Sequence, residues 1–168
     1  SAALREDIEA AYTFFEYAIA LDPEFAYPWN GKGYALGSLN RYDEALAAFE
    51  KAIALDPEFA PPWLNKGVIL LRQKHYDEGL VAVQKAIALD SQYAIAHYNL
   101  GVLYWHQERP RDAAKAFYRA IELDLDSAER EAAESWIERA KRMIESEEAG
   151  KSGEEREQED RSSDVALV

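Results

Sequence analysis

The pentapeptide AIALD stands at residues 18–22, 52–56 and 86–90, and the variant AIELD follows at 120–124. Each copy begins 34 residues after the one before it. A fixed period of this length is typical of proteins built from repeated helix pairs. The period therefore governs the expected fold.

Each block that ends at the repeated aspartate holds two stretches with helical apolar spacing and a polar turn between them. In the first block, Ala45, Phe49 and Ala52 fall on one face, and Asp43 is placed to cap the helix that carries them, as Asp77 is in the second. A pair this small cannot bury both faces alone, but stacked copies cover one another. We therefore predict an all-α fold, a right-handed superhelical solenoid of antiparallel helix pairs.

The chain divides around these pairs. Three 34-residue repeats occupy residues 23–124, and residues 1–22 match only the second helix of a repeat. Residues 125–147 predict an amphipathic helix that caps the solenoid. Residues 148–168 are acidic, and this composition predicts a flexible tail. The last residues, VALV at 165–168, either dock in a groove of a neighbouring molecule or remain solvated.

The three blocks resemble the tetratricopeptide repeat, which places an aromatic, Leu-Gly, Ala, Phe, Ala and Pro at set intervals. The matching residues are Trp29, Gly33, Leu36, Tyr42, Ala45, Phe49, Ala52 and Pro57; Trp63, Gly67, Leu70, Tyr76 and Ala86; and His97, Leu100, Gly101, Tyr104, Ala113, Phe117 and Ala120. The three glycines fall where the helices of a pair should approach most closely. Gly79 and Val83 replace the usual Ala and Phe, and we expect looser packing there.

The resemblance implies that the first helix of each pair lines a concave groove. The residues carried over to that groove are Tyr27, Asn30, Tyr34, Leu64, Asn65, Val68, Leu71, Arg72, Ile95, Tyr98, Asn99, Val102, Trp105 and His106. The asparagines either bind the backbone of a peptide or tie adjacent helices together. One subfamily clamps a C-terminal carboxylate pair with lysines and an arginine. Of that set only Asn65 matches here, which disfavours an acidic chaperone tail as the ligand.

The resemblance implies a non-catalytic scaffold that binds an extended or helical segment of a protein or peptide through apolar or aromatic anchors. Two alternatives stay open, a structural module that assembles with itself and a regulatory fragment of a larger enzyme. Self-association would use the C-terminal tail or the first helix. That helix carries aromatic residues around most of its circumference, namely Tyr12, Phe14, Phe15 and Tyr17.

Composition and spacing disfavour other functions. The net charge of −13 opposes binding to a nucleic-acid backbone. The chain has no cysteine, and His97 and His106 lie about 180° apart on a helix, so we expect no metal and no cofactor. No nucleophile with a nearby base suggests an enzyme. No apolar run approaches the roughly 20 residues of a membrane span, and among compartments the cytoplasm is favoured.

Overall fold

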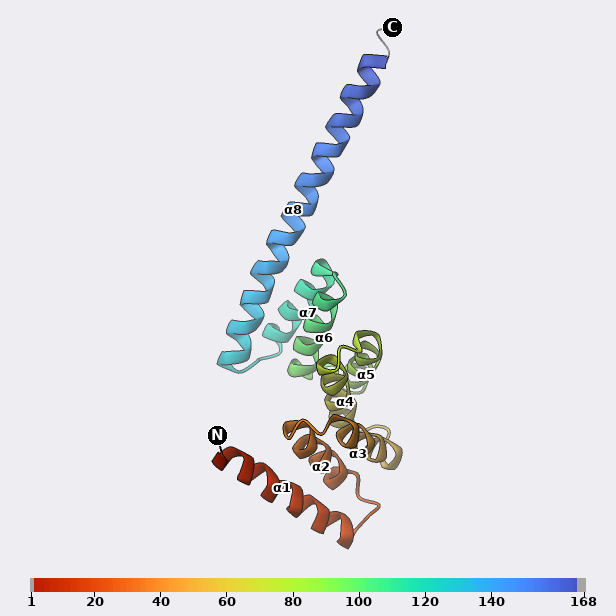
Figure 1. The fold of residues 1–168 in the computed structure, drawn as a ribbon, viewed down its shortest axis with the longest axis vertical. Coiled ribbons are helices and arrows are strands. Elements are labelled where there is room, and N and C mark those ends of the chain that lie inside the picture. Colours follow the sequence, from red (N-terminus) through yellow and green to blue (C-terminus); the bar gives the residue numbers. More distant parts are fainter. Residues whose placement is uncertain (1, 166–168) are drawn as a thin grey trace.

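The computed structural model describes residues 2–165 of the 168-residue chain, with side chains for residues 3–150. Within that range every regular element is a helix, and there is no strand. The helices are α1 (Ala2–Leu21), α2 (Ala26–Ser38), α3 (Tyr42–Leu55), α4 (Ala60–Arg72), α5 (Tyr76–Leu89), α6 (Ala94–His106), α7 (Pro110–Glu122) and α8 (Ser127–Val165). They stack in chain order as antiparallel pairs, with α8 projecting beyond the stack (Figure 1). The predicted all-helical solenoid is confirmed.

Glycine on the first helix of each pair lets the second helix approach. A Cβ atom added to Gly33 would lie 2.5 Å from the ring of Phe49, and one added to Gly101 would lie 2.7 Å from the ring of Phe117. Both phenylalanines are fully buried, so neither ring has free space to enter. The expected role of these glycines is confirmed.

The pair α4–α5 packs closely, and the expected looser packing is wrong. A Cβ atom on Gly79 would lie only 3.2 Å from the carbonyl oxygen of Gly67. Val83 is completely buried. Because both helices carry a glycine at the crossing and valine replaces a large ring, the two backbones come close enough to fill the space.

The turn within each repeat has a residue with positive φ, and the first two repeats also contact the next repeat beside this turn. Asn40, Lys74 and Glu108 occupy equivalent positions with φ of 61°, 64° and 57°. Left-handed residues commonly end helices. Asp43 and Asp77 do not cap α3 and α5, because neither helix has a side-chain cap. Their carboxylates instead accept hydrogen bonds from Gln73 and Gln107, the residues that follow α4 and α6, at 3.2 and 2.7 Å.

The last helix packs on α7 and continues past the expected boundary. Ala133, Ile137 and Ala140 are buried against the third pair, as a capping helix requires. The sequence predicts that this helix ends near residue 147, whereas α8 continues to Val165. Residues 147–161 are rich in Glu, Lys, Arg and Gln, which favour helix intrinsically. The final VALV segment lies almost wholly outside the described residues.

Candidate functional site

A small hollow opens between α2 and α4. Tyr34 and Ser38 of α2 line it from one side, and Asn65, Val68 and Arg72 of α4 line it from the other. Its volume is about 70 Å³. Tyr34 is 66% exposed at its rim. Four of the predicted groove residues therefore share one site, joined by Ser38, which the sequence prediction missed.

The asparagines make structural contacts. Asn65 donates from Nδ2 to Oδ1 of Asn30 at 3.0 Å, which joins α4 to α2. Asn99 donates from Nδ2 to the carbonyl oxygen of Ile95 at 2.8 Å, within its own helix. Of the two interpretations left open by the sequence, Asn30 and Asn65 satisfy the one in which they tie adjacent helices. The acceptor oxygen of Asn65 is not used in that bond.

The groove residues of the third pair are largely engaged by other rings. Tyr98 lies edge-on to Phe117, with ring centroids 5.5 Å apart. Trp105 lies 5.1 Å from Trp136 of α8 and, with Val102, packs against the core of this pair. His106 stacks on the ring of Tyr76 at 4.8 Å. Each of these contacts reduces the ring surface open to a ligand, and none of the residues reaches the α2–α4 hollow.

Two further predicted groove residues lie elsewhere. Leu64 is 3% exposed and belongs to the core beneath α4, because its position faces the neighbouring helices rather than solvent. Tyr27 lines a different hollow, together with Phe25 and Phe59. The sequence prediction missed Phe25 and Phe59, although their 34-residue spacing was a signal that could have found them.

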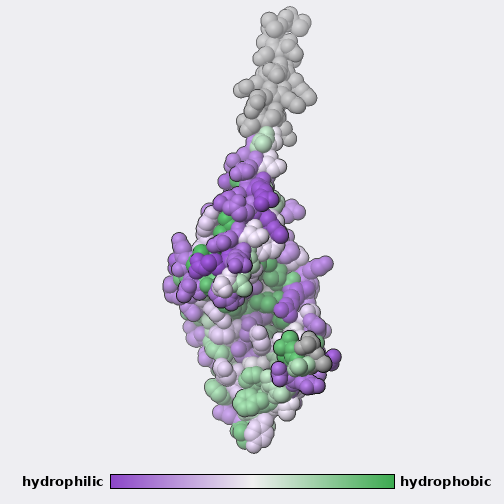
Figure 2. Space-filling model, turned by 90° about the vertical axis from the view of Figure 1, so that its left-hand side faces the viewer, coloured by the Kyte–Doolittle hydropathy of each residue, from purple (hydrophilic) through white to green (hydrophobic). Residues whose placement is uncertain are grey.

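Helix α1 presents two of its four central aromatics to solvent. Phe14 and Tyr17 are 65% and 67% exposed, whereas Tyr12 and Phe15 are half-buried against the first pair. The ring of Phe15 fills the space above Gly31, where a Cβ atom would lie 2.3 Å from it. Hydrophobic residues gather at the end of the molecule where α1 lies, away from the projecting helix (Figure 2).

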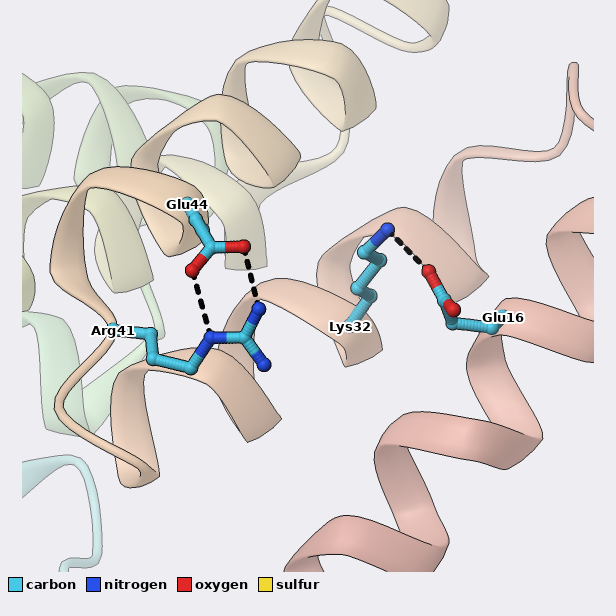
Figure 3. Close-up of polar contacts among 4 residues, drawn as sticks. All are labelled: Glu16, Lys32, Arg41 and Glu44. Carbon is cyan, nitrogen blue, oxygen red and sulfur yellow. Dashed lines mark hydrogen bonds and ion pairs between the residues drawn. The ribbon is translucent and has the colours of Figure 1, made fainter.

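One ion pair joins α1 to the first repeat, and a second lies within that repeat (Figure 3). Lys32 Nζ lies 2.6 Å from Glu16 Oε1, and this hydrogen bond lowers the pKa of Glu16. Arg41 forms a two-pronged pair with Glu44 at 2.7 and 2.6 Å, which lowers the pKa of that carboxyl group. Lys32 and Arg41 also lie over the ring of Tyr12, at 5.6 and 5.4 Å. These two cations are therefore committed to structure.

Arg72 differs from them, since no described residue forms an ion pair with it. It is exposed beside the hollow and is the one cation that lines it. Among the described residues, no group of three His, Cys, Asp or Glu side chains is placed to hold a metal ion. None of the described helices is both long and apolar enough to cross a membrane.

Comparison with known proteins gives a consistent result. Two family models described as tetratricopeptide repeat match residues 26–59 and 64–145. No curated protein matches the chain. Solved structures with this fold include the first TPR of Spaghetti (RPAP3), bound to the HSP90 peptide SRMEEVD. It has a TM-score of 0.67 at 22% identity, over 73% of this chain and 95% of that one.

Two structures of MamA have the same fold. The first has a TM-score of 0.64 at 19% identity, over 88% of this chain and 94% of that one. The second, the MamA RS-1 ArsTM double mutant, has a TM-score of 0.63 at 23% identity, over 86% and 90%. The family models span most of the chain, from the first repeat into α8. The chain belongs to the tetratricopeptide-repeat family.

Proposed function

We propose that this chain is a non-catalytic scaffold that binds an extended or helical segment of another protein on its concave face. Membership of a family of interaction repeats supports a binding role. The Spaghetti repeat, which has the same fold, was solved with a bound peptide. The ligand of this chain carries apolar or aromatic anchors.

The observation that carries the proposal is the α2–α4 hollow. Tyr34 offers an exposed ring beside Val68, so an apolar side chain placed there covers both. Aromatic residues next to a small pocket are the usual sites of strong binding contributions. The free amide oxygen of Asn65 accepts a backbone N–H of the ligand. Each group thus has a distinct role toward an extended segment.

The charge of this surface argues against an acidic tail such as SRMEEVD. Lys32 and Arg41 are paired with Glu16 and Glu44, and Arg72 is the only cation lining the hollow. One guanidinium balances at most one carboxylate, whereas SRMEEVD carries several. An apolar segment with a single acidic residue beside its anchor fits this surface best.

A peptide-library selection followed by titration tests the proposal. Peptides selected on the wild type should bind Tyr34→Ala/Val68→Ala at least tenfold more weakly. Tyr118→Ala, which removes an exposed ring from α7, is the matched control and should bind as the wild type does. Far-UV circular dichroism should show equal helicity in all three. Equal binding by both variants contradicts the site, and selection of SRMEEVD-like tails contradicts the ligand class.

The exposed aromatics of α1 favour a second candidate, self-assembly. Phe14 and Tyr17 together leave a patch of the kind that marks interfaces. If α1 joins two copies, Phe14→Lys/Tyr17→Lys should lower the mass seen in sedimentation equilibrium, while Val81→Lys on α5 should not. A wild-type chain that stays monomeric at millimolar concentration excludes this candidate.

A further inference from the structure

Three aromatic rings form a row along the edge of the solenoid, where the turns between repeats lie. The rings of Phe25 and Tyr27 stack with centroids 6.2 Å apart, and Tyr27 and Phe59 follow at 6.4 Å. Phe25 and Tyr27 remain 54% and 57% exposed despite these contacts. The row joins the turn before α2 to the turn before α4, so two adjacent repeats are needed to make it.

The same rings line a hollow of about 430 Å³ that also has a negative charge. Glu24, Ala26, Leu55 and Asp56 complete its wall, and no Lys or Arg lines it. Asp56 accepts the N–H of Glu58 through Oδ1 at 3.1 Å, and its second oxygen takes no part in that bond. The exposed carboxylate of Glu24 lies on the opposite turn. Carboxylates therefore flank the ring row from both turns.

The sequence carries the turn segment that builds this hollow twice and then departs from it. The segment DPEF occurs at residues 22–25 and 56–59, but the third turn reads DSQY at 90–93. The glutamate is replaced by Gln92, and the position equivalent to Tyr27 holds Ile95. Tyr93 is half-buried in the core of α4–α6. The third turn thus has the same backbone hydrogen bond through Asp90 but lacks the exposed ring row, which makes it an internal control.

We propose that the hollow formed by Phe25, Tyr27 and Phe59 with Glu24 and Asp56 binds the arginine side chain of a basic peptide segment. Aromatic faces attract cations through their quadrupole. A planar guanidinium can lie on an exposed ring while its N–H groups donate to a carboxylate at the edge. The excess negative charge of the chain favours the approach of such a segment.

This site is separate from the concave groove. None of its lining residues is shared with the α2–α4 hollow around Tyr34 and Arg72. The two sites also have opposite preferences, because the groove carries a cation and the edge hollow carries carboxylates. A substitution that abolishes binding at one site should leave the other intact, so the edge site does not depend on the proposed groove function.

The test uses two matched probes, the peptide amide Gly-Ser-Gly-Arg-Gly-Ser-Gly and the same peptide with citrulline in place of arginine. Citrulline keeps the planar shape and removes the charge. Titration into the ¹⁵N-labelled full chain should shift the backbone amides of residues 22–27 and 55–60, with a dissociation constant near 1 mM, as suits one small contact. Citrulline should bind at least fivefold more weakly.

Variants then separate a local site from general charge attraction. Glu24→Gln/Asp56→Asn retains an oxygen for the turn at residue 56 and should weaken arginine binding at least fivefold. Tyr27→Ala should weaken it about as much. Asp90→Asn removes the equivalent charge from the third turn and should change nothing. Equal binding of the citrulline peptide, equal loss with Asp90→Asn, or shifts confined to the concave groove would each overturn the proposal.

Discussion

The helices at the two ends of the solenoid differ in how fully they are buried against the neighbouring helix pair. At the C-terminal end, α8 lays Ala133, Ile137 and Ala140 into the third pair, and all three are buried. At the N-terminal end, no described side chain of α1 is fully buried, and Phe14 and Tyr17 face solvent. One end of the array is closed by an amphipathic helix, and the other leaves aromatic surface exposed.

The difference shows what an end helix needs in order to cap a stack of repeats. A cap requires an apolar face on one side and a polar face on the other. The part of α8 that contacts α7 has that division, with Glu134, Glu138 and Lys141 exposed. In α1 the aromatics are distributed over both sides, so burying one face leaves the other uncovered. Stability is therefore expected to concentrate in the third pair.

Deleting an end helix should give the largest contrast. Removal of residues 127–168 uncovers Phe117 and Trp105 and takes away the stacked ring of Trp136. The loss of several buried side chains should lower the melting temperature by roughly 10 °C or more. Removal of residues 1–22 takes away only half-buried contacts and should lower it by a few degrees. Circular dichroism during heating measures both. Equal losses would contradict the contrast.

Single phenylalanines should repeat the contrast on a smaller scale. Phe117→Ala empties a fully buried site between Gly101, Tyr98 and Trp136, and should lower the free energy of unfolding by about 3 to 5 kcal/mol. Phe15→Ala removes a half-buried ring at the other end and should cost about 1 to 2 kcal/mol. Urea titration gives both values. If Phe15→Ala proved as costly as Phe117→Ala, α1 would be as tightly packed as α8.

Replacing the glycines beneath these two rings by alanine should cost less stability than removing the rings, and the cost should differ between the two ends. An alanine Cβ at Gly101 would meet the ring of Phe117 at 2.7 Å, and one at Gly31 would meet the ring of Phe15 at 2.3 Å. Phe117 cannot move, so Gly101→Ala should destabilise by about 1 to 3 kcal/mol. The half-buried ring of Phe15 can turn outward to make room. The resulting loss of packing is offset because alanine is more favourable than glycine within a helix by about 1 kcal/mol, so Gly31→Ala should be near neutral. A larger loss at Gly31 than at Gly101 would show that Phe15 is rigidly held.

The fold was predictable because the 34-residue period includes glycines that are needed wherever the two helices of a pair cross. Gly33 and Gly101 must lie where helices cross, whatever surrounds them. The binding surface was less predictable because it depends on distances between repeats. Whether the Asn65 amide N–H reaches Asn30, and whether Trp105 stays open or meets Trp136, depends on how closely the neighbouring helices pack. The prediction of loose packing at Gly79 was wrong for the same reason. The backbones of α4 and α5 approach each other there and fill the volume that a larger side chain would occupy.

The smallest expected effect is the dependence of stability on pH. It distinguishes a hydrogen bond that joins two helices from one that lies within a single helix. Hydrogen bonding to Lys32 lowers the pKa of Glu16 from its ordinary value of 4.5, and this bond joins α1 to α2. Lys141 lowers the pKa of Glu138 in the same way, but both residues belong to α8. A carboxylate with a lowered folded-state pKa stabilises the fold above about pH 4.5, and the contribution disappears as the pH falls through that lowered value.

Acidification should therefore loosen α1 before it loosens the cap. The difference in free energy of unfolding between wild type and Glu16→Gln should be small and positive at pH 6, because the Glu16 carboxylate is exposed and water screens its pair with Lys32. It should vanish below the folded-state pKa of Glu16, which the ¹³C shift of its carboxyl carbon reports directly. Protection of α1 amides from hydrogen exchange, compared between the two proteins at each pH, should fall over the same range. Glu138→Gln should leave α1 protection unchanged, since its partner lies in α8. If both variants lowered that protection equally, the loss would reflect net charge and not the bond between Glu16 and Lys32.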